Sequence, residues 1–172
     1  MLKYLLIISI FLFCSYTGIL LGKRYINRYK NLCEVNKYSN LLKNEILYKN
    51  TPLPEALINI ENNENKVFGE IFKQVAEDLI CGKKYTAYDS FKEIYIKQKS
   101  EFYFTKEDEK TIADFLMVLG ESGVYGQQNA FDLFKMNIER NLKEAEEVSK
   151  KNSKLYSSLG VLTGAMISIF LI

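Results

Sequence analysis

The chain of 172 residues contains no histidine, only two prolines and only three cysteines. Without histidine, the most common general base and metal ligand of proteins is missing. Cys14, Cys33 and Cys81 form neither a CxxC pair nor a zinc-site spacing, and an odd, scattered set fits reduced, buried thiols. The phosphate-binding patterns GxxxxGK[ST] and GxGxxG do not occur. We therefore expect no catalytic residues, no metal site and no cofactor.

A long run without charged side chains lies near each end of the chain. No Asp, Glu, Lys or Arg occurs from Tyr4 to Gly22 or from Leu155 to Ile172. Because a membrane-spanning helix needs roughly 17–25 predominantly apolar residues, both runs qualify. We interpret residues 4–22 and 155–172 as transmembrane helices. A cleaved signal peptide is the alternative for the first run, but its apolar core is usually only about 7–15 residues long.

The charged residues between these runs are nearly balanced in sign. All 21 acidic and 22 of the 23 basic residues lie there, so residues 23–154 carry a net charge of +1. This balance argues against nucleic acid binding, which requires a strongly basic patch. Basic residues gather beside each apolar run, where anionic lipid headgroups would attract them: Lys23, Arg24, Arg28, Lys30, Lys143, Lys150, Lys151 and Lys154. By the positive-inside rule, the middle segment is cytoplasmic and both termini lie outside.

Apolar residues of the middle segment recur at helical spacing. We predict an all-α fold, a cytoplasmic bundle of about six helices flanked by an N-terminal and a C-terminal transmembrane helix. Predicted helix starts are Thr51 as an N-cap before Pro52, Thr86–Asp89 and Thr105–Asp108. The short helix after Thr51 should end near Asn62, and a helix from about Asn65 to Cys81 should stop at Gly82. The aromatic run 101–104 could be extended, residues 122–126 form a loop, and a final helix begins near Gln127.

The final predicted helix has two features of its own. Its apolar residues recur at alternating +3 and +4 spacing, as a bundle core or a docking surface for a partner helix would require. The positions are Phe131, Phe134, Ile138, Asn141, Ala145, Val148, Asn152 and Leu155, of which the two asparagines are polar. Gly160 and Gly164 form a small-xxx-small pair that lets two membrane helices approach closely. The expected partner is the first run, with Gly18 and Gly22, or a second copy; lipid-facing variation is the alternative.

Residues 44–57, NEILYKNTPLPEAL, are the most distinctive stretch. They resemble the signature of the stage III sporulation protein AB family of endospore-forming bacteria, in which a helix ending near E-I-x-Y precedes T-P-L-P-E-A-L. Residues 22–25 resemble the family's first anchor, and residues 154–164 its C-terminal anchor. The chain departs from the pattern at Ser122-Gly123, where the family has Ser-Asp, so a contact made by that acidic residue is in doubt.

The resemblance implies a non-enzymatic platform or adaptor in an eight-protein sporulation assembly that bridges mother cell and forespore. The implied domain is similar in fold to the platform protein of type II secretion and type IV pilus machines. Expected partners are the operon-encoded cytoplasmic ATPase, other stage III sporulation membrane proteins and the lipid bilayer. A second copy of the chain is a further possible partner, which would make the protein a homo-oligomer. The implied location is the mother cell membrane around the forespore.

Two groups of residues are candidate partner contacts under this reading: Thr51, Pro52, Leu53, Pro54 and Glu55 in a predicted rigid turn, and the basic pair Lys83 and Lys84. In the alternative for the first group, the prolines only shape the turn and Leu53 caps the core. Two other functions compete with the platform role. A small oligomerising pore or holin-like protein would need more polar residues within the spans than the Ser and Thr found there. A hydrolase using Cys33 or Cys81 would lack its histidine.

Overall fold

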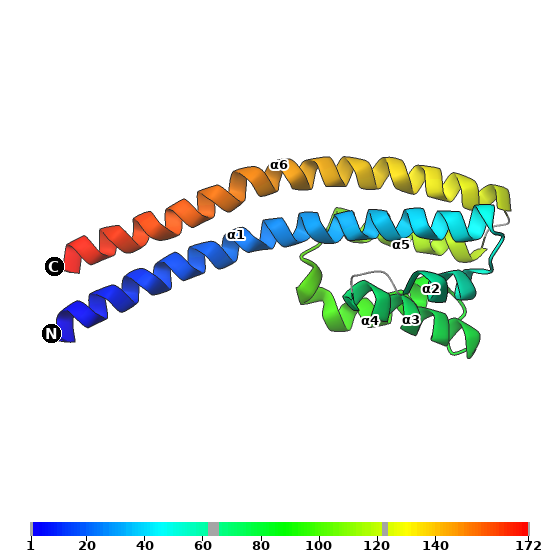
Figure 1. The fold of residues 1–172 in the computed structure, drawn as a ribbon, viewed down its shortest axis with the longest axis horizontal. Coiled ribbons are helices and arrows are strands. Elements are labelled where there is room, and N and C mark those ends of the chain that lie inside the picture. The colour runs from blue at the N-terminus through cyan, green and yellow to red at the C-terminus, as the bar shows by residue number, and fades with distance from the viewer. Residues whose placement is uncertain (1, 62–65, 122–123, 172) are drawn as a thin grey trace. The chain divides into compact units, whose positions relative to one another are not determined.

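The structure is a computed structural model, which describes residues 2–61, 66–121 and 124–171 (Figure 1). Within these ranges the chain forms six α-helices, one short π-helical segment and no β-strand, so the predicted all-α fold is confirmed. The elements are α1 (Leu2–Lys43), η1 (Asn44–Tyr48), α2 (Leu53–Glu61), α3 (Lys66–Ile80), α4 (Ala87–Phe102), α5 (Lys106–Glu121) and α6 (Val124–Leu171). The chain divides into two compact units. Unit 1 is Met1–Lys30 with Lys143–Ile172, and unit 2 is Asn31–Leu142.

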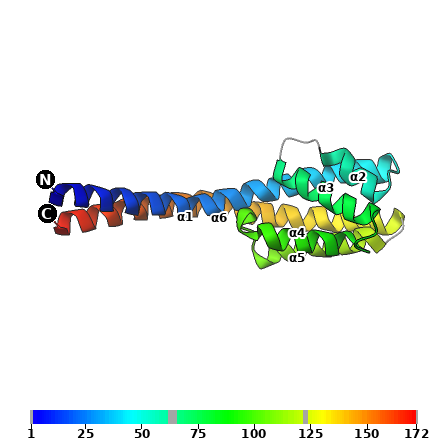
Figure 2. The same ribbon diagram turned by 90° about the horizontal axis from the view of Figure 1, so that it is seen from below.

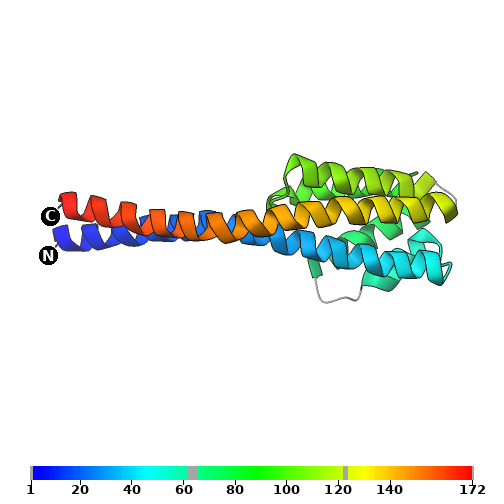
Figure 3. The same cartoon turned by 90° about the horizontal axis from the view of Figure 1, so that it is seen from above.

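Unit 1 is an antiparallel pair made by one end each of α1 and α6, which lie side by side in Figures 2 and 3. Many of its large apolar side chains face outward: Phe13, Met166 and Phe170 are 70%, 74% and 92% exposed. Contiguous apolar surface of this kind is rare on soluble proteins and marks membrane or protein contacts. Both helices are long and apolar enough to cross a membrane, which is consistent with membrane association.

Unit 2 buries its core where α1, α3, α4, α5 and α6 meet. The ring of Phe115 stacks on that of Phe134 with centroids 4.2 Å apart, and the rings of Tyr38 and Phe72 lie 5.0 Å apart. Only a small cavity of about 30 Å³ remains among these side chains. The predicted apolar stripes supply several of the most deeply buried residues, namely Leu32, Tyr38, Ile71, Val75, Leu119 and Ile138. The helical periodicity of the sequence therefore located this core.

Two predicted helix starts are confirmed. Thr86 Oγ1 accepts a hydrogen bond from the backbone N–H of Asp89 at 3.1 Å. At the start of α5 the bonding is reciprocal: the Thr105 N–H donates to Asp108 Oδ2 at 2.9 Å, and the Asp108 N–H donates to Thr105 Oγ1 at 3.3 Å. These bonds satisfy backbone donors that the first turn of a helix leaves free. The predicted stop after α3 also holds, since Gly82 has the left-handed φ of 65° that glycine adopts without strain.

Other boundaries differ from the prediction. The aromatic run is not extended, because α4 continues through the buried Phe102 and Tyr103 then ends it with a left-handed φ of 56°. Helix α6 begins at Val124 rather than near Gln127, so glycine at position 126 lowers helix propensity without preventing the helix. The rest of that predicted loop, residues 122–123, lies outside the described residues, as do the predicted helix ends at Asn62 and Asn65.

Candidate functional site

The predicted contact turn, residues 51–55, follows η1, a π-helical segment that is wider than the α-helix before it. In η1 the backbone bonds span five residues instead of four, and the last of them joins the Lys49 N–H to the Asn44 carbonyl oxygen at 3.2 Å. Asn50 then takes a left-handed φ of 55°, a conformation that asparagine tolerates better than most residues. The Thr51 N–H reaches back to the Glu45 carbonyl oxygen at 3.0 Å. These bonds end the first helix and turn the chain towards α2.

The carboxylate of Glu45 ties three parts of this turn together. It pairs with Lys49 Nζ, accepts a hydrogen bond from Thr51 Oγ1 at 3.3 Å, and accepts another from Asn59 Nδ2 of α2 at 3.1 Å. Hydrogen bonds from Lys49 and Asn59, with the positive charge of Lys49, hold the pKa of Glu45 below its usual value. The ionised carboxylate therefore fixes the turn against the first turns of α2.

The start of α2 corrects one prediction. Thr51 is not the N-cap: the first helical bond runs from the Ala56 N–H to the Pro52 carbonyl oxygen at 2.9 Å, so Pro52 occupies that position and Leu53 opens the helix. The Thr51 hydroxyl is instead directed to Glu45. Pro54 falls in the first turn, as predicted, where no backbone N–H donor is needed.

The five predicted contact residues differ in accessibility. Pro52 and Glu55 are exposed, whereas Thr51, Leu53 and Pro54 are half-buried. Pro52 and Glu55 are therefore free to touch a partner, while the other three also contact their own unit. Tyr48, at the end of η1, adds a side chain that is 75% exposed.

The second candidate group, Lys83 and Lys84, is less basic than its sequence indicates. Lys84 Nζ lies 2.8 Å from Glu93 Oε2, and Lys83 Nζ lies 3.8 Å from Asp78 Oδ1. The hydrogen bond and charge of Glu93 raise the pKa of Lys84, and Lys84 together with Lys97 lowers the pKa of Glu93. Because both lysines pair with carboxylates on the same surface, they attract an acidic ligand less strongly than unpaired lysines would.

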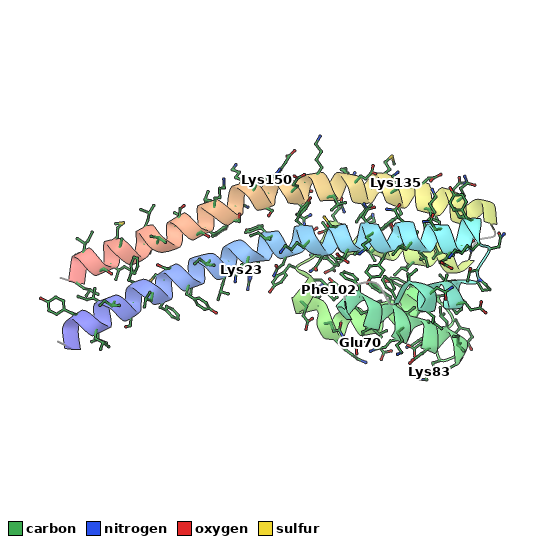
Figure 4. All side chains as sticks on the ribbon, viewed as in Figure 1. Lys23, Glu70, Lys83, Phe102, Lys135 and Lys150 are labelled. Carbon is green, nitrogen blue, oxygen red and sulfur yellow. The ribbon has the colours of Figure 1, made fainter. Side chains whose placement is uncertain are left out.

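Both candidate groups lie at one end of unit 2. Helix α2 runs away from the proline turn, α3 returns towards it, and the lysine pair follows α3, as Figures 1 and 4 show. The figures place Lys83 at this end, with Glu70 further back along α3. The two groups are therefore available to a single partner surface.

The glycine pair of α6 contacts α1 of the same chain. A Cβ added to Gly160 would lie 2.8 Å from the Gly18 Cα atom and 2.9 Å from the Cys14 carbonyl oxygen. One added to Gly164 would lie 3.2 Å from the Phe11 carbonyl oxygen. At Gly160 these distances leave no room for a side chain, so the two backbones meet directly there, whereas at Gly164 the neighbouring atoms would have to shift slightly.

Two features of unit 2 were not predicted from the sequence. The role of Glu45 in fixing the turn depends on Asn59, fourteen residues away, and nothing in their spacing indicates it. A cavity of about 280 Å³ opens between α4 and α5, where aromatic side chains meet Lys92 and Lys99. At its edge Tyr95 donates a hydrogen bond to Glu109 at 2.9 Å; burial, then this bond, raises the pKa of Tyr95.

The described residues contain no group of three or more His, Cys, Asp or Glu side chains placed to hold a metal ion. All three cysteines are free thiols, of which Cys81 is exposed and the others half-buried.

A model of the stage III sporulation protein AB family matches residues 3–172. The chain belongs to this family. The stage III sporulation protein AB of Bacillus subtilis (strain 168) is 26% identical to it over 175 residues, covering 99% of each chain. A solved structure of a stage III sporulation protein AB shares its fold with a TM-score of 0.64 and 20% identity, covering 72% of this chain and 97% of the other. The family that the proline motif indicated is thus confirmed.

Proposed function

We propose that this chain is a non-enzymatic membrane platform of the channel complex between mother cell and forespore. In this role it couples a cytoplasmic secretion-type ATPase to the membrane components of the same complex. Membership of the family supports a sporulation role, and neither the family nor the two relatives are named as enzymes. The proposal adds the platform role, the ATPase and the mother cell membrane.

The outward-facing apolar residues of unit 1 support a double membrane anchor. In the proposal, residues 4–22 and 155–172 span the bilayer and residues 23–154 lie in the cytoplasm. Lipid would cover side chains such as Phe13 and Phe170, which are left exposed. The basic residues that flank both runs favour this orientation, because cytoplasmic loops carry an excess of Lys and Arg.

Cys81 provides a test of this orientation, because its side chain is exposed. In a Cys14→Ser, Cys33→Ser background it is the single thiol of the chain. We expect a membrane-impermeant maleimide to label it only after the cell membrane has been opened. Labelling in intact cells would place residue 81 outside and overturn the orientation.

The proline turn is the proposed ATPase contact. Glu45 holds its backbone in one conformation, and a surface ordered before binding loses less entropy when a partner docks. Pro52 and Glu55 are the exposed residues of this surface. Lys83 and Lys84, at the same end of unit 2, form a second proposed contact.

One observation carries the proposal. The family match runs from residue 3 to residue 172, and in this sequence one polar helical unit lies between two apolar helical segments. Helices α1 and α6 continue from unit 1 into unit 2 without a break. A force applied to unit 2 would therefore reach the anchors through two covalent connections, as an adaptor requires.

The test is co-purification of the full chain in detergent with the ATPase of the same operon. Glu55→Arg reverses an exposed charge in the turn, and Glu70→Arg makes the same change on an exposed residue of α3 (Figure 4). We expect Glu55→Arg to reduce binding at least tenfold and Glu70→Arg to leave it within twofold, with helical content unchanged in both. No binding by the folded wild-type chain would overturn the coupling role.

A further inference from the structure

Unit 1 carries four exposed cations at one level of its helix pair. We call Lys23, Arg24, Lys151 and Lys154 the basic collar. A Cβ added to Gly22 would lie 2.9 Å from the Ser153 carbonyl oxygen, so α1 and α6 meet closely at this point. Every collar residue is within two positions of Gly22 or Ser153 along its helix. Close backbone packing thus places cations from both helices at the same level of the pair.

No carboxylate of the described residues pairs with the collar. In the described part of the chain none of its four residues forms an ion pair, although the next basic residue along each helix does. Arg28 Nη1 lies 3.2 Å from Glu144 Oε1, and Lys150 pairs with Glu146. The described carboxylates therefore neutralise the cations next to the collar and leave the collar itself to anions of its surroundings.

The sequence excludes acidic partners on the apolar side of the collar. No Asp or Glu occurs before Glu34 or after Glu147. The two long apolar runs begin within a few residues of the collar. Anions that balance it must therefore lie beside an apolar surface, and this is where the phosphates of membrane lipids are found.

An aromatic pair marks the same level. The rings of Tyr25 and Tyr156, one from each helix, stack with centroids 5.6 Å apart and planes 18° from parallel. Tyrosine is enriched at the boundary between membrane and water, where its ring lies at the depth of the lipid headgroups. Figure 4 shows Lys23 on α1 and Lys150 on α6 in the same stretch of the helix pair, on its two outer sides.

We propose that the basic collar is a two-helix binding site for the phosphate groups of anionic phospholipids. The site rests on the proposed membrane-anchored function and adds a specific lipid class to it. Because the glycine contacts bring α1 and α6 together, the four cations lie at one level of the helix pair, where headgroups of the same leaflet can reach cations of both helices. Each cation close to the surface strengthens binding by about fivefold.

The test is native mass spectrometry of the full chain released from detergent micelles with phosphatidylglycerol or phosphatidylcholine added. The collar variant Lys23→Gln, Lys154→Gln removes one exposed cation from each helix. The control variant Lys30→Gln, Lys143→Gln makes the same change in charge on exposed residues about 10 Å or more further along the helices. The two variants therefore differ in the position of the lost charge and not in its size.

We expect the collar variant to bind phosphatidylglycerol about 25-fold more weakly than wild type, and the control variant to change by less than about threefold. Phosphatidylcholine binding should be equal in all three. Equal affinity of wild type for the two lipids, or equal losses in both variants, would overturn the site. Full competition by millimolar glycerol 1-phosphate would assign the collar to small phosphates and overturn the lipid assignment.

ATPase co-purification separates this inference from the proposed function. A wild-type chain that binds the ATPase but shows no preference for phosphatidylglycerol refutes the lipid site alone. A chain that prefers phosphatidylglycerol but does not bind the ATPase refutes the coupling role alone.

Discussion

Units 1 and 2 hold their helices together in opposite ways. In unit 1 the backbones touch, because Gly18 and Gly160 leave no space for a side chain between α1 and α6. In unit 2 the helices are kept apart by aromatic rings such as Phe115 and Phe134. In water, burying apolar area stabilises by about 25 cal/mol per Å². Lipid offers no such gain, so helices there associate through close packing of small residues.

Polar side chains inside the apolar runs of unit 1 differ from those in the core of unit 2. In the apolar runs, the hydroxyl groups of Thr17 and Ser168 donate to carbonyl oxygens of their own helices, at 2.9 and 2.8 Å. In unit 2 polar groups connect different helices: Asn141 Nδ2 of α6 donates to Thr111 Oγ1 of α5 at 3.3 Å, although Asn141 is buried. The pairing of α1 and α6 through Arg28 and Glu144 lies outside the apolar runs, in the part of unit 1 that we propose to be in water.

The largest expected effect tests the aromatic core of unit 2. Phe115→Ala removes a ring that contacts both Phe131 and Phe134, and a buried Phe→Ala change costs about 3–5 kcal/mol. We expect the free energy of unfolding of unit 2, measured by urea titration with circular dichroism in detergent, to fall by this amount. Leu133→Ala, at a site 56% exposed, is the control and should cost less than about 1 kcal/mol. Equal losses would show that the rings do not dominate the core.

A smaller effect is expected at the glycine contact of unit 1. Gly160→Leu forces a side chain against the α1 backbone, and overpacking typically costs about 1–3 kcal/mol. The distance between spin labels at Ile8 and Ile167, both exposed, should change from a narrow to a broad distribution in pulsed electron resonance. Thr163→Leu, on an exposed position of the same helix, should keep the narrow distribution. If both variants keep it, the glycines are not needed for pairing.

The two units also differ in how far the sequence predicts them. Apolar periodicity located the core of unit 2, and the short-range caps at Thr86 and Thr105 follow from residues three positions apart. The small-xxx-small pattern predicts that the glycines contact another helix, but it does not decide whether that helix is α1 or belongs to a second copy of the chain. That choice depends on the register of α1 against α6, which brings Gly18 opposite Gly160 and is not encoded in either helix alone.

The proline turn shows where local patterns fail. Thr51 before a proline has the residue type of an N-cap, yet its hydroxyl goes to Glu45, because η1 widens the preceding helix and brings that carboxylate within reach. The charge of Lys84 also has a partner, because Glu93 approaches it from the next helix. Both contacts join residues that only the folded chain brings together.

The smallest expected effect is the pH response of the turn. Since the folded-state pKa of Glu45 lies below its ordinary value of 4.5, its charge stabilises the turn fully above that pH, and this contribution is lost as the pH falls through the lowered pKa. We expect the side-chain amide resonance of Asn59, followed by nuclear magnetic resonance, to titrate with a midpoint below 4.5. In Glu45→Gln this titration should vanish while unit 1 is unchanged. A midpoint at or above 4.5 would mean that Lys49 and Asn59 do not hold the carboxylate in solution, and the turn would then lack the preorganisation on which the proposed ATPase contact depends.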